Sequence, residues 1–315
     1  MLHAMNPTPK ASTSLRAIVR PTTLIESARL SNHLGARVTL ASETFQYTGS
    51  FKFRAAYNIA SRVPQTKILA ASSGNFGQAV AYACQLLGKS CIIVMPHTSA
   101  RVKIDAVREY GGSVDLTDGR VKGRNARVAE LALEHTDAYI ASAFDDPLVI
   151  EGNASLGDEL AELKKRFDVI IAPVGGGGLT SGLITGLCAA GVTTKVFGAE
   201  PLMANDAARS LLEGRIVENE TEPQTIADGA RTPSLGKRNW AILQKGLAGI
   251  VEVPEERIAE AVRLLFTHAN LKAEPTGALS VAAVLTDPDK FRGLSVCCVI
   301  SGGNVDVDVY QELLS

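Results

Sequence analysis

The sequence lacks the long apolar segments that mark membrane proteins and secreted precursors. No apolar run approaches the 18 or more residues of a membrane-spanning helix, and the first residues, MLHAMNPTPKASTS, include no apolar segment like that of a secretory signal. We expect about the first dozen residues to form a flexible arm. The chain therefore predicts a protein with no membrane partner.

The sequence is also poor in the cysteine and histidine spacings that bind metals. Its five cysteines form no CxxC pair and lie in apolar runs, and its five histidines show no metal-ligand spacing. Reduced, buried thiols are therefore expected, and these favour a cytoplasmic location. The cysteines are Cys84, Cys91, Cys188, Cys297 and Cys298.

Charge of one sign is nowhere in excess. The formal net charge is −1, and acidic and basic residues are interspersed, so no basic stripe is available to bind a phosphodiester backbone. This charge pattern argues against a nucleic-acid partner. A small-molecule ligand fits better, because a chain of 315 residues exceeds the size of one hydrophobic core and two lobes leave a cleft between them.

Strand and helix patterns alternate along most of the chain. RVTLASE, KILAA, SCIIVMP, DVIIAPV and LSVCCVI have the pattern of strands, and helical patterns separate them. This alternation predicts an α/β protein with parallel sheets, in which strands such as DVIIAPV are covered on both faces. Apolar residues at helical spacing with a closing glycine predict a helix over 21–35.

One stretch, YTGSFKFRAAYNIA from Tyr47 to Ala60, places a lysine where a helix begins. A Gly-Ser turn precedes Lys52, so this residue is expected in the first helical turn. Helix N-termini favour anions, and a cation is therefore unfavourable there unless its amine has another task. One such task is to bind an aldehyde covalently as a Schiff base.

Two turns of small residues follow strands and begin helices. In VGGGG, the backbone N–H groups of Gly175 to Gly178 can converge on a phosphate at the positive end of a helix. The alternatives are a dinucleotide site, although Thr180 stands where the third glycine belongs, and a turn without a ligand. In SSGNFGQA, the turn can bind a carboxylate, or Ser73 or Asn75 can simply cap the helix.

The motifs SFKFRAAYN, SSGNFGQA, VGGGGLTSG and SGGNVD, in this order, resemble the fold-type II pyridoxal-phosphate enzymes, within them the serine/threonine dehydratase and serine racemase group. The resemblance runs from about Pro21 to Asp306. It implies a tryptophan synthase β-like fold of two parallel-sheet α/β domains with the cofactor in the cleft between them. The large domain would comprise 1–66 and 146–315, and a small mobile domain 67–145.

The resemblance also implies roles for single residues. Lys52 would hold pyridoxal phosphate and act as the base, while Ser73 would be a second catalytic group that supplies a proton. The other implied cofactor contacts are Asn75 at the ring oxygen, Gly175, Gly176, Gly177 and Gly178 at the phosphate, and Ser301 at the pyridine nitrogen. The implied substrate contacts are Ser72, Ser73, Gly74, Asn75, Phe76, Arg124 and Ser234.

A divalent-cation site is implied in AEPLMANDAA. Glu200, Asp206 and the carbonyl of Ala204 resemble the cation ligands of the racemase and dehydratase group, and such oxygen ligands suit Mg²⁺, Ca²⁺ or Mn²⁺. Asp206 is equally suited to be the N-cap of the following helix.

The chain departs from the group's pattern at two places. Phe76 stands where many relatives have histidine, which leaves the side chain of the preferred substrate open. EGNASLGDE replaces the usual Gly-Gln-Gly-Thr run, so Glu151 and Asn153 alter either the substrate pocket or only local packing.

The function that the resemblance implies is a pyridoxal-phosphate-dependent ammonia-lyase. It would convert L-serine or L-threonine to a 2-oxo acid and ammonia, with the proton for the leaving hydroxyl coming from the cofactor phosphate or Ser73. The alternatives are an amino acid racemase, a hydroxyaspartate dehydratase, a β-replacement enzyme, which SFKFRAA fits less well, and a non-catalytic sensor. A homodimer or higher homo-oligomer is expected.

Overall fold

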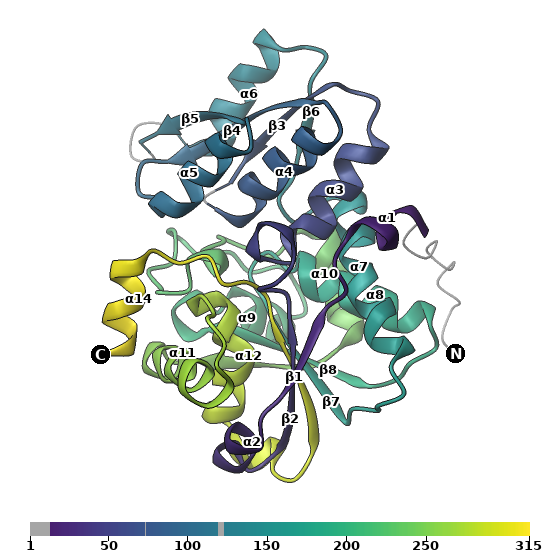
Figure 1. The fold of residues 1–315 in the computed structure, drawn as a ribbon, viewed down its shortest axis with the longest axis vertical. Helices are drawn as coiled ribbons and strands as arrows, with labels where there is room; N and C mark the ends of the chain where they lie inside the picture. The colour runs from purple at the N-terminus through teal and green to yellow at the C-terminus, as the bar shows by residue number, and fades with distance from the viewer. Residues whose placement is uncertain (1–12, 73, 119–122) are drawn as a thin grey trace.

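The chain folds around two separate β-sheets, one above the other in Figure 1. The computed structural model describes residues 13–72, 74–118 and 123–315. Within these ranges, no helix combines the length and apolar character needed to span a bilayer. The expected N-terminal arm falls outside the described residues, as does Ser73. We call the elements around the six-stranded sheet the large lobe and those around the four-stranded sheet the small lobe.

The sheet of the large lobe has the strand order β1-β2-β10-β7-β8-β9. Only β1 at the edge runs antiparallel to its neighbour. The two central strands are buried at every residue because helices cover both faces of the sheet. The strands are β1 (Thr23–Glu26), β2 (Arg37–Ser42), β7 (Val169–Pro173), β8 (Lys195–Pro201), β9 (Leu247–Val253) and β10 (Ser295–Ile300).

Helices cover both faces of this sheet. One core cluster lies under α2 (Ala28–Leu34), α11 (Glu255–Ala269) and α12 (Pro275–Thr286). The other lies under α7 (Pro147–Glu162), α8 (Gly178–Ala189) and α10 (Lys237–Gly246). The shorter elements are α1 (Thr13–Ile18), η1 (Tyr47–Gly49), η2 (Leu202–Ala204), α9 (Asp206–Glu213), η3 (Asp228–Ala230), α13 (Pro288–Phe291) and α14 (Val307–Leu314).

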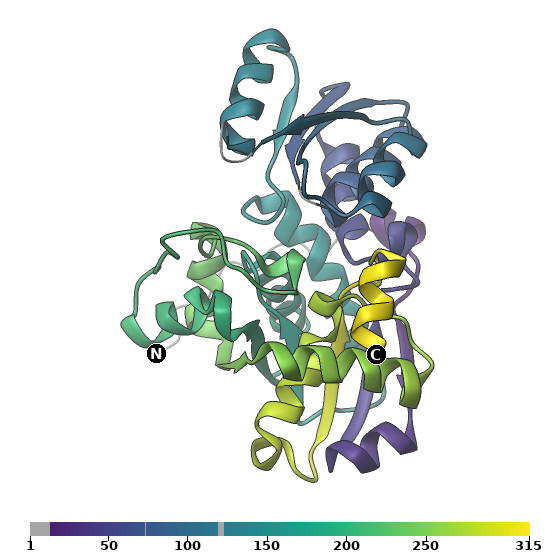
Figure 2. The same cartoon turned by 90° about the vertical axis from the view of Figure 1, so that its left-hand side faces the viewer.

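The sheet of the small lobe is entirely parallel, in the order β5-β4-β3-β6. Helices α4 and α5 cover one face and α6 the other, as the turned view in Figure 2 also shows. The elements are β3 (Lys67–Ala71), α4 (Asn75–Leu86), β4 (Ser90–Pro96), α5 (Arg101–Glu109), β5 (Ser113–Thr117), α6 (Arg124–Glu134) and β6 (Tyr139–Ala141).

Helix α3 (Lys52–Arg62) lies where the two lobes meet. Its apolar residues Phe53, Ala56 and Ile59 belong to the core cluster under the small sheet, and the helix also packs against α7. The two parallel-sheet α/β lobes confirm the predicted fold class, whereas the limits of the domains, 67–145 and the remainder, stay a prediction.

Two sequence expectations are wrong. Residues 21–35 do not form one helix: Thr23–Glu26 pairs as a strand with β2, and helix α2 starts only after Ser27, whose side chain accepts a hydrogen bond from the N–H of Leu30. Here the strand preference of β-branched residues beside an open sheet edge determines the structure, although the apolar residues have helical spacing. Cys188, expected to be buried, is exposed, because it lies near the solvent-facing end of α8.

Candidate active site

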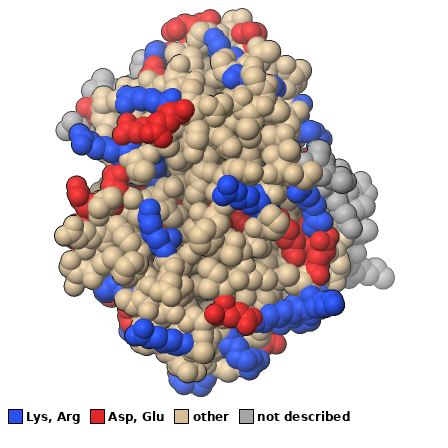
Figure 3. Space-filling view, viewed as in Figure 1, with Lys and Arg blue, Asp and Glu red and all other residues tan. Residues whose placement is uncertain are grey.

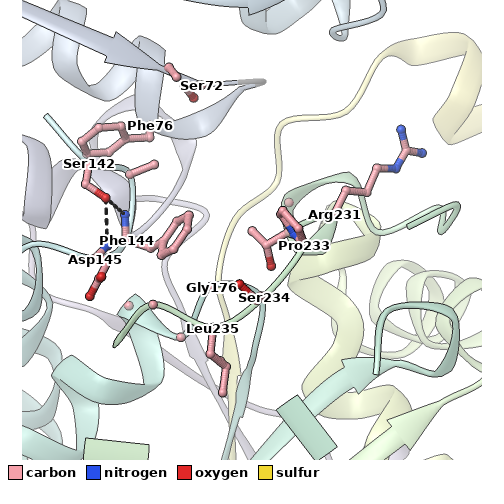
Figure 4. A pocket seen from close by; sticks show the side chains of 18 of the residues that line it. Ser72, Phe76, Ser142, Phe144, Asp145, Gly176, Arg231, Pro233, Ser234 and Leu235 are labelled. Atoms are coloured by element: carbon pink, nitrogen blue, oxygen red, sulfur yellow. Dashed lines mark hydrogen bonds between the residues drawn. The ribbon is translucent and has the colours of Figure 1, made fainter. Parts of the chain in front are cut away.

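A cavity of about 1120 Å³ lies between the two lobes and is lined by residues of both. Figure 4 shows Phe76, Ser142 and Phe144 on one side and Pro233 and Ser234 on the other. Figure 3 shows acidic and basic residues interspersed over the face of the molecule that it presents. The cavity contains Lys52 and members of each of the four sequence motifs.

Lys52 is the first residue of α3, as the sequence predicts. The chain reverses direction before it at Thr48 and Gly49, both of which have positive φ. The N–H of Phe51 then donates to the carbonyl of Ser301 at 3.0 Å. The start of the helix is thereby attached to the end of β10, a central strand of the large lobe.

The amine of Lys52 is held in an apolar part of the cavity. It donates a hydrogen bond of 2.8 Å to the carbonyl of Ala143 and lies 5.0 and 5.6 Å from the ring centroids of Phe51 and Phe76. Burial lowers the pKa of Lys52 to about 8, and the nearby carboxylate of Glu274 opposes this change. A larger fraction of the amine is therefore neutral, and nucleophilic, than for an exposed lysine.

The tetraglycine loop, Gly175–Gly178, connects β7 to α8 and lines the cavity. Gly177 has φ +90°, and a Cβ on it would lie 2.8 Å from a methyl carbon of Leu243. A Cβ on Gly176 would lie 2.4 Å from the ring of Phe144. Only glycine fits this turn, and the loop presents the N-terminus of a 12-residue helix to the cavity, where an anion is favoured.

Two asparagines hold the tetraglycine loop from behind. Asn239 donates to the carbonyls of Gly176 at 2.7 Å and Phe144 at 3.0 Å, and Asn153 donates to the carbonyl of Gly178 at 3.0 Å. Asn153 also packs against Gly182: a Cβ on Gly182 would lie 2.4 Å from the Cβ of Asn153. The departure at EGNAS therefore supports the loop by local packing.

Glu151, the other unusual residue of that run, pairs with Arg62 at 2.8 Å on the surface. Neither Glu151 nor Asn153 is among the described residues that line the cavity.

The turn between β3 and α4 forms the small-lobe wall of the cavity. The hydroxyl oxygen of Ser72 accepts hydrogen bonds from the N–H groups of Gly74 and Gly77 at 3.1 and 3.0 Å. Asn75 does not cap the helix. Its amide nitrogen donates to Glu274 at 2.5 Å, and its oxygen accepts from Asn304 at 2.9 Å. Phe76 is 2% exposed and lines the cavity.

Ser301 follows β10 directly and lines the cavity. It is 2% exposed, and the next residue, Gly302, forms a β-bridge with Ser50 just before Lys52. The structure thus brings Ser301 and Lys52 to the same end of the large sheet.

Arg124 and Ser234 lie on opposite lobes at the cavity wall. Arg124 begins α6, and its guanidinium lies 3.7 Å from a carboxylate oxygen of Glu222 in the large lobe. Ser234 belongs to the segment between η3 and α10, facing the cavity in Figure 4. Their contact with a substrate stays a prediction.

Comparison with known proteins decides the family. Residues 15–302 match the family model described as pyridoxal-phosphate dependent enzyme. The chain belongs to this family. Its relatives include the L-threo-3-hydroxyaspartate ammonia-lyase of Pseudomonas sp, 36% identical over 97% of this chain and 96% of the relative.

Two solved structures extend the similarity to the whole fold. The threonine deaminase of T.th. is 42% identical, with a TM-score of 0.86 over 93% of this chain and 95% of its own. The serine racemase of maize is 29% identical, with a TM-score of 0.90 over 96% of this chain and 94% of its own. The enzyme therefore belongs among the pyridoxal-phosphate-dependent ammonia-lyases and racemases.

The residues of the cavity fit pyridoxal phosphate, the cofactor of this family. Lys52 offers a partly neutral amine to an aldehyde. The tetraglycine loop lines the cavity at the N-terminus of α8, where backbone N–H groups without side chains in front of them favour an anion such as a phosphate. The dinucleotide alternative for VGGGG is excluded by the family match, which spans the loop.

The implied cation site lies at the end of β8. Asp206 is not the N-cap of α9, because the carboxylate of Glu200 accepts the hydrogen bonds of Ala207 and Ala208, at 3.1 and 2.6 Å, instead. Asp206 Oδ1 accepts from Asn219, but its Oδ2 is buried and has no hydrogen-bond partner in the described chain.

Burial raises the pKa values of both carboxyl groups, that of Asp206 to about 7. The orphaned oxygen of Asp206 fits a cation. However, the described residues contain no cluster of three or more histidine, cysteine, aspartate or glutamate side chains placed for a metal, so any further ligands must be backbone carbonyls, such as that of Ala204, or water.

Among the charged residues of the cavity that sequence reasoning missed are Lys103, Asp228 and Glu274, which lie in contact with one another. Lys103 is buried on the same face of α5 as Ile104 and Val107, and Glu274 stands between Ala273 and Pro275 at the start of an apolar helix. The available signal was a charged residue at an apolar position of a helix pattern. Such a residue is expected to be buried, and a buried charge needs a partner of opposite charge.

Proposed function

We propose that the enzyme removes water from a β-hydroxy amino acid, L-serine or L-threonine, to give a 2-oxo acid and ammonia. The observation that carries this proposal is the position of Lys52, whose amine of lowered pKa lies in one cavity with the tetraglycine loop and the 72–75 turn. These three features supply a base, a phosphate site and a carboxylate site.

Different residues of the chain would carry out the separate steps of this reaction. When bound, pyridoxal phosphate withdraws electrons from the Cα–H bond of an attached amino acid. The amine of Lys52 would take the α proton, and the electron pair left on Cα would expel the β hydroxyl, which departs as water once protonated. The hydroxyl of Ser72 and the N–H of Asn75 would orient the substrate carboxylate, because the N–H groups of Ser72 and Gly74 already donate within the chain. Ser73, as proton donor, lies outside the described residues.

Two features support the rest of the cofactor contacts. The amide nitrogen of Asn75 carries two hydrogens. One forms the hydrogen bond to Glu274, so the second can donate to the ring oxygen of the cofactor. The hydroxyl of Ser301 can donate to an unprotonated pyridine nitrogen. A weaker electron sink of this kind favours direct elimination.

L-threo-3-hydroxyaspartate is a second candidate substrate. The Pseudomonas relative is named for it, and the cationic side chains on the cavity wall, among them Lys237, can pair with a second carboxylate. Ammonia release by the purified holoenzyme against L-serine, L-threonine and both diastereomers of 3-hydroxyaspartate decides between them. Activity on none of these would contradict the proposed reaction.

Racemisation requires a proton donor on the opposite face of the substrate, and similarity to the maize serine racemase favours testing it. Chiral chromatography of L-serine after incubation separates the two reactions. Pyruvate without D-serine supports the ammonia-lyase alone, whereas D-serine without pyruvate would replace it by a racemase.

A further inference from the structure

Lys103 is a buried lysine that joins the two lobes. It belongs to α5 of the small lobe, and its side chain is 3% exposed. Its amine lies 2.6 Å from Asp228 Oδ2 and 3.2 Å from Glu274 Oε2, both on the large lobe. Because water scarcely reaches this ammonium group, its two ion pairs must replace its hydration, and separating the lobes would break both.

The stem of Lys103 packs directly against Gly74, in the turn that precedes α4. A Cβ on Gly74 would lie 2.5 Å from Cδ of Lys103. A glycine is therefore required at position 74 for the lysine side chain to reach the large lobe. The position of the turn that faces the substrate carboxylate is in this way coupled to the position of Lys103.

Glu274 contacts both Lys103 and Asn75. Its Oε1 accepts from Asn75 Nδ2 at 2.5 Å, while its Oε2 faces Lys103. The oxygen of Asn75 accepts from Gln78 and Asn304, at 3.1 and 2.9 Å. An ionised carboxylate only accepts hydrogen bonds, so it fixes which end of the Asn75 amide is the nitrogen. A protonated Glu274 would remove this constraint.

Lys103 acts on the charge of Glu274. Burial raises the pKa of this carboxyl group, and Asp228 acts in the same direction, whereas Lys103 and the hydrogen bond from Asn75 lower it. The lysine is thus the cation that favours the ionised carboxylate in a site from which water is excluded.

Asp228, the other partner of Lys103, belongs to a turn that packs against the tetraglycine loop. Asp228 begins η3, and Ala230 in the same turn lies so close to the loop that a Cβ on Gly175 would be 3.1 Å from its Cα. One ammonium group therefore connects the turn that faces the substrate, the amide that faces the cofactor ring and the segment behind the phosphate site.

We propose that Lys103 is a positioning residue that fixes the 72–75 turn and the Asn75 amide against the large lobe, through Glu274 and Asp228. This inference rests on the proposed function for its effect on turnover, but not for its effect on structure. The amine of Lys103 faces Asp228 and Glu274, so its role is to position other groups.

The test compares the holoenzyme with Lys103→Met and Lys103→Arg, with Lys89→Met as control. Lys89 also lies in the small lobe and its amine bonds the carbonyl of Val63, away from the cavity. Lys103→Met should lower kcat by roughly tenfold to a hundredfold with a smaller change in KM, because misplacement by about 1 Å costs this much. Lys103→Arg, which keeps the charge, should recover part of the loss.

Two readouts do not depend on turnover. In Lys103→Met, amide hydrogen exchange should accelerate in 74–78 and 228–230 but not in β7, and the circular dichroism of the bound cofactor should weaken. Lys89→Met should change neither. Unchanged exchange and dichroism in Lys103→Met would overturn the proposal, even if the enzyme turned over no amino acid tested.

A double-mutant cycle tests the route through Glu274. Glu274→Gln should reproduce the kcat loss of Lys103→Met, and the double variant should lose no more than the larger single loss. Losses that multiply would overturn this route. If Lys103→Met does not fold, Asp228→Asn and Glu274→Gln take its place, and unchanged exchange in 74–78 in both would overturn the proposal.

Discussion

The amine of Lys52 donates a hydrogen bond of 2.8 Å to the carbonyl oxygen of Ala143. Lys52 begins α3, and Ala143 lies between β6 of the small lobe and α7 of the large lobe. The amine is therefore placed by the segment that joins the lobes. This acceptor is uncharged, which is consistent with an amine that loses its proton easily.

The first prediction concerns the pH dependence of cofactor uptake. Burial lowers the pKa of Lys52 from 10.5 to about 8, so below pH 8 most of the amine is protonated and cannot attack an aldehyde. The rate constant for uptake of pyridoxal phosphate by the cofactor-free protein should rise about tenfold per pH unit below this value and level off above it. Stopped-flow absorbance measures it.

Glu274→Gln provides the control for this profile. The charge of Glu274 raises the pKa of Lys52, so the midpoint should move to lower pH in the variant. A midpoint near 10.5 in the unmodified protein would show that the amine is not buried as described.

The second prediction concerns Gly177. Alanine at this position would have to adopt φ +90° and would place its Cβ 2.8 Å from a methyl carbon of Leu243, so the loop must shift away from Leu243. Affinity for pyridoxal phosphate should fall by at least about tenfold, since the phosphate site depends on aligned N–H groups. Equilibrium dialysis or fluorescence titration measures it.

Gly191 is the matched control, because it has φ +71° near the far end of the same helix but no atom within 4 Å of its Cβ position. Gly191→Ala should cost about 1 kcal/mol of stability and leave cofactor affinity unchanged. Equal losses of affinity in both variants would mean that the loop is not the phosphate site.

The third prediction concerns the cation site. Burial raises the pKa of Asp206 from 3.8 to about 7, so between these values the folded state binds a proton that the unfolded chain does not. Stability therefore falls as pH rises through this window. Bound Mg²⁺ or Ca²⁺ would offset the loss, by about 2.7 kcal/mol at a hundred times the dissociation constant.

Thermal unfolding with and without the cation, at pH 6 and pH 8, checks this. The increase in Tm should be larger at pH 8 and absent in Asp206→Asn. An equal increase in Asp206→Asn would place any cation elsewhere.

The fourth prediction concerns Arg54, two residues beyond Lys52. Its guanidinium is fully buried and pairs with Glu43 at 2.8 Å and Glu159 at 2.6 Å, tying α3 to the end of β2 and to α7. Arg54→Met leaves two carboxylates without their cation and should cost about 3–5 kcal/mol of unfolding free energy. Denaturant titration of the holoenzyme measures the change.

Arg62→Met, on the same helix, removes only the half-exposed pair with Glu151 and should cost no more than about 1 kcal/mol. If the two variants were equally stable, the buried network would not be what fixes α3.

The sequence predicted those parts of the site that local chemistry specifies. A lysine at a helix start, four successive glycines after a buried strand and a serine after another each have a local reason, and the family resemblance gave them their order. The structure brings Lys52, the tetraglycine loop and Ser301 together because all three follow strands of one sheet.

What the sequence did not predict depends on contacts between distant segments. Nothing local indicates that Lys103 meets Glu274, which is far along the chain and on the other lobe, or that Glu200 rather than Asp206 caps α9. The segment Thr23–Glu26 forms a strand by pairing with the edge of β2, which helical spacing along the chain did not indicate. Such pairings follow from topology, which a pattern along the chain does not contain.

The most direct test of the account is reduction of the purified holoenzyme with borohydride, followed by peptide mass spectrometry and by assay of Lys52→Ala. The phosphopyridoxyl group should be attached at Lys52, and Lys52→Ala should be inactive with every β-hydroxy amino acid. Attachment at another lysine, or substantial ammonia release by Lys52→Ala, would contradict the account.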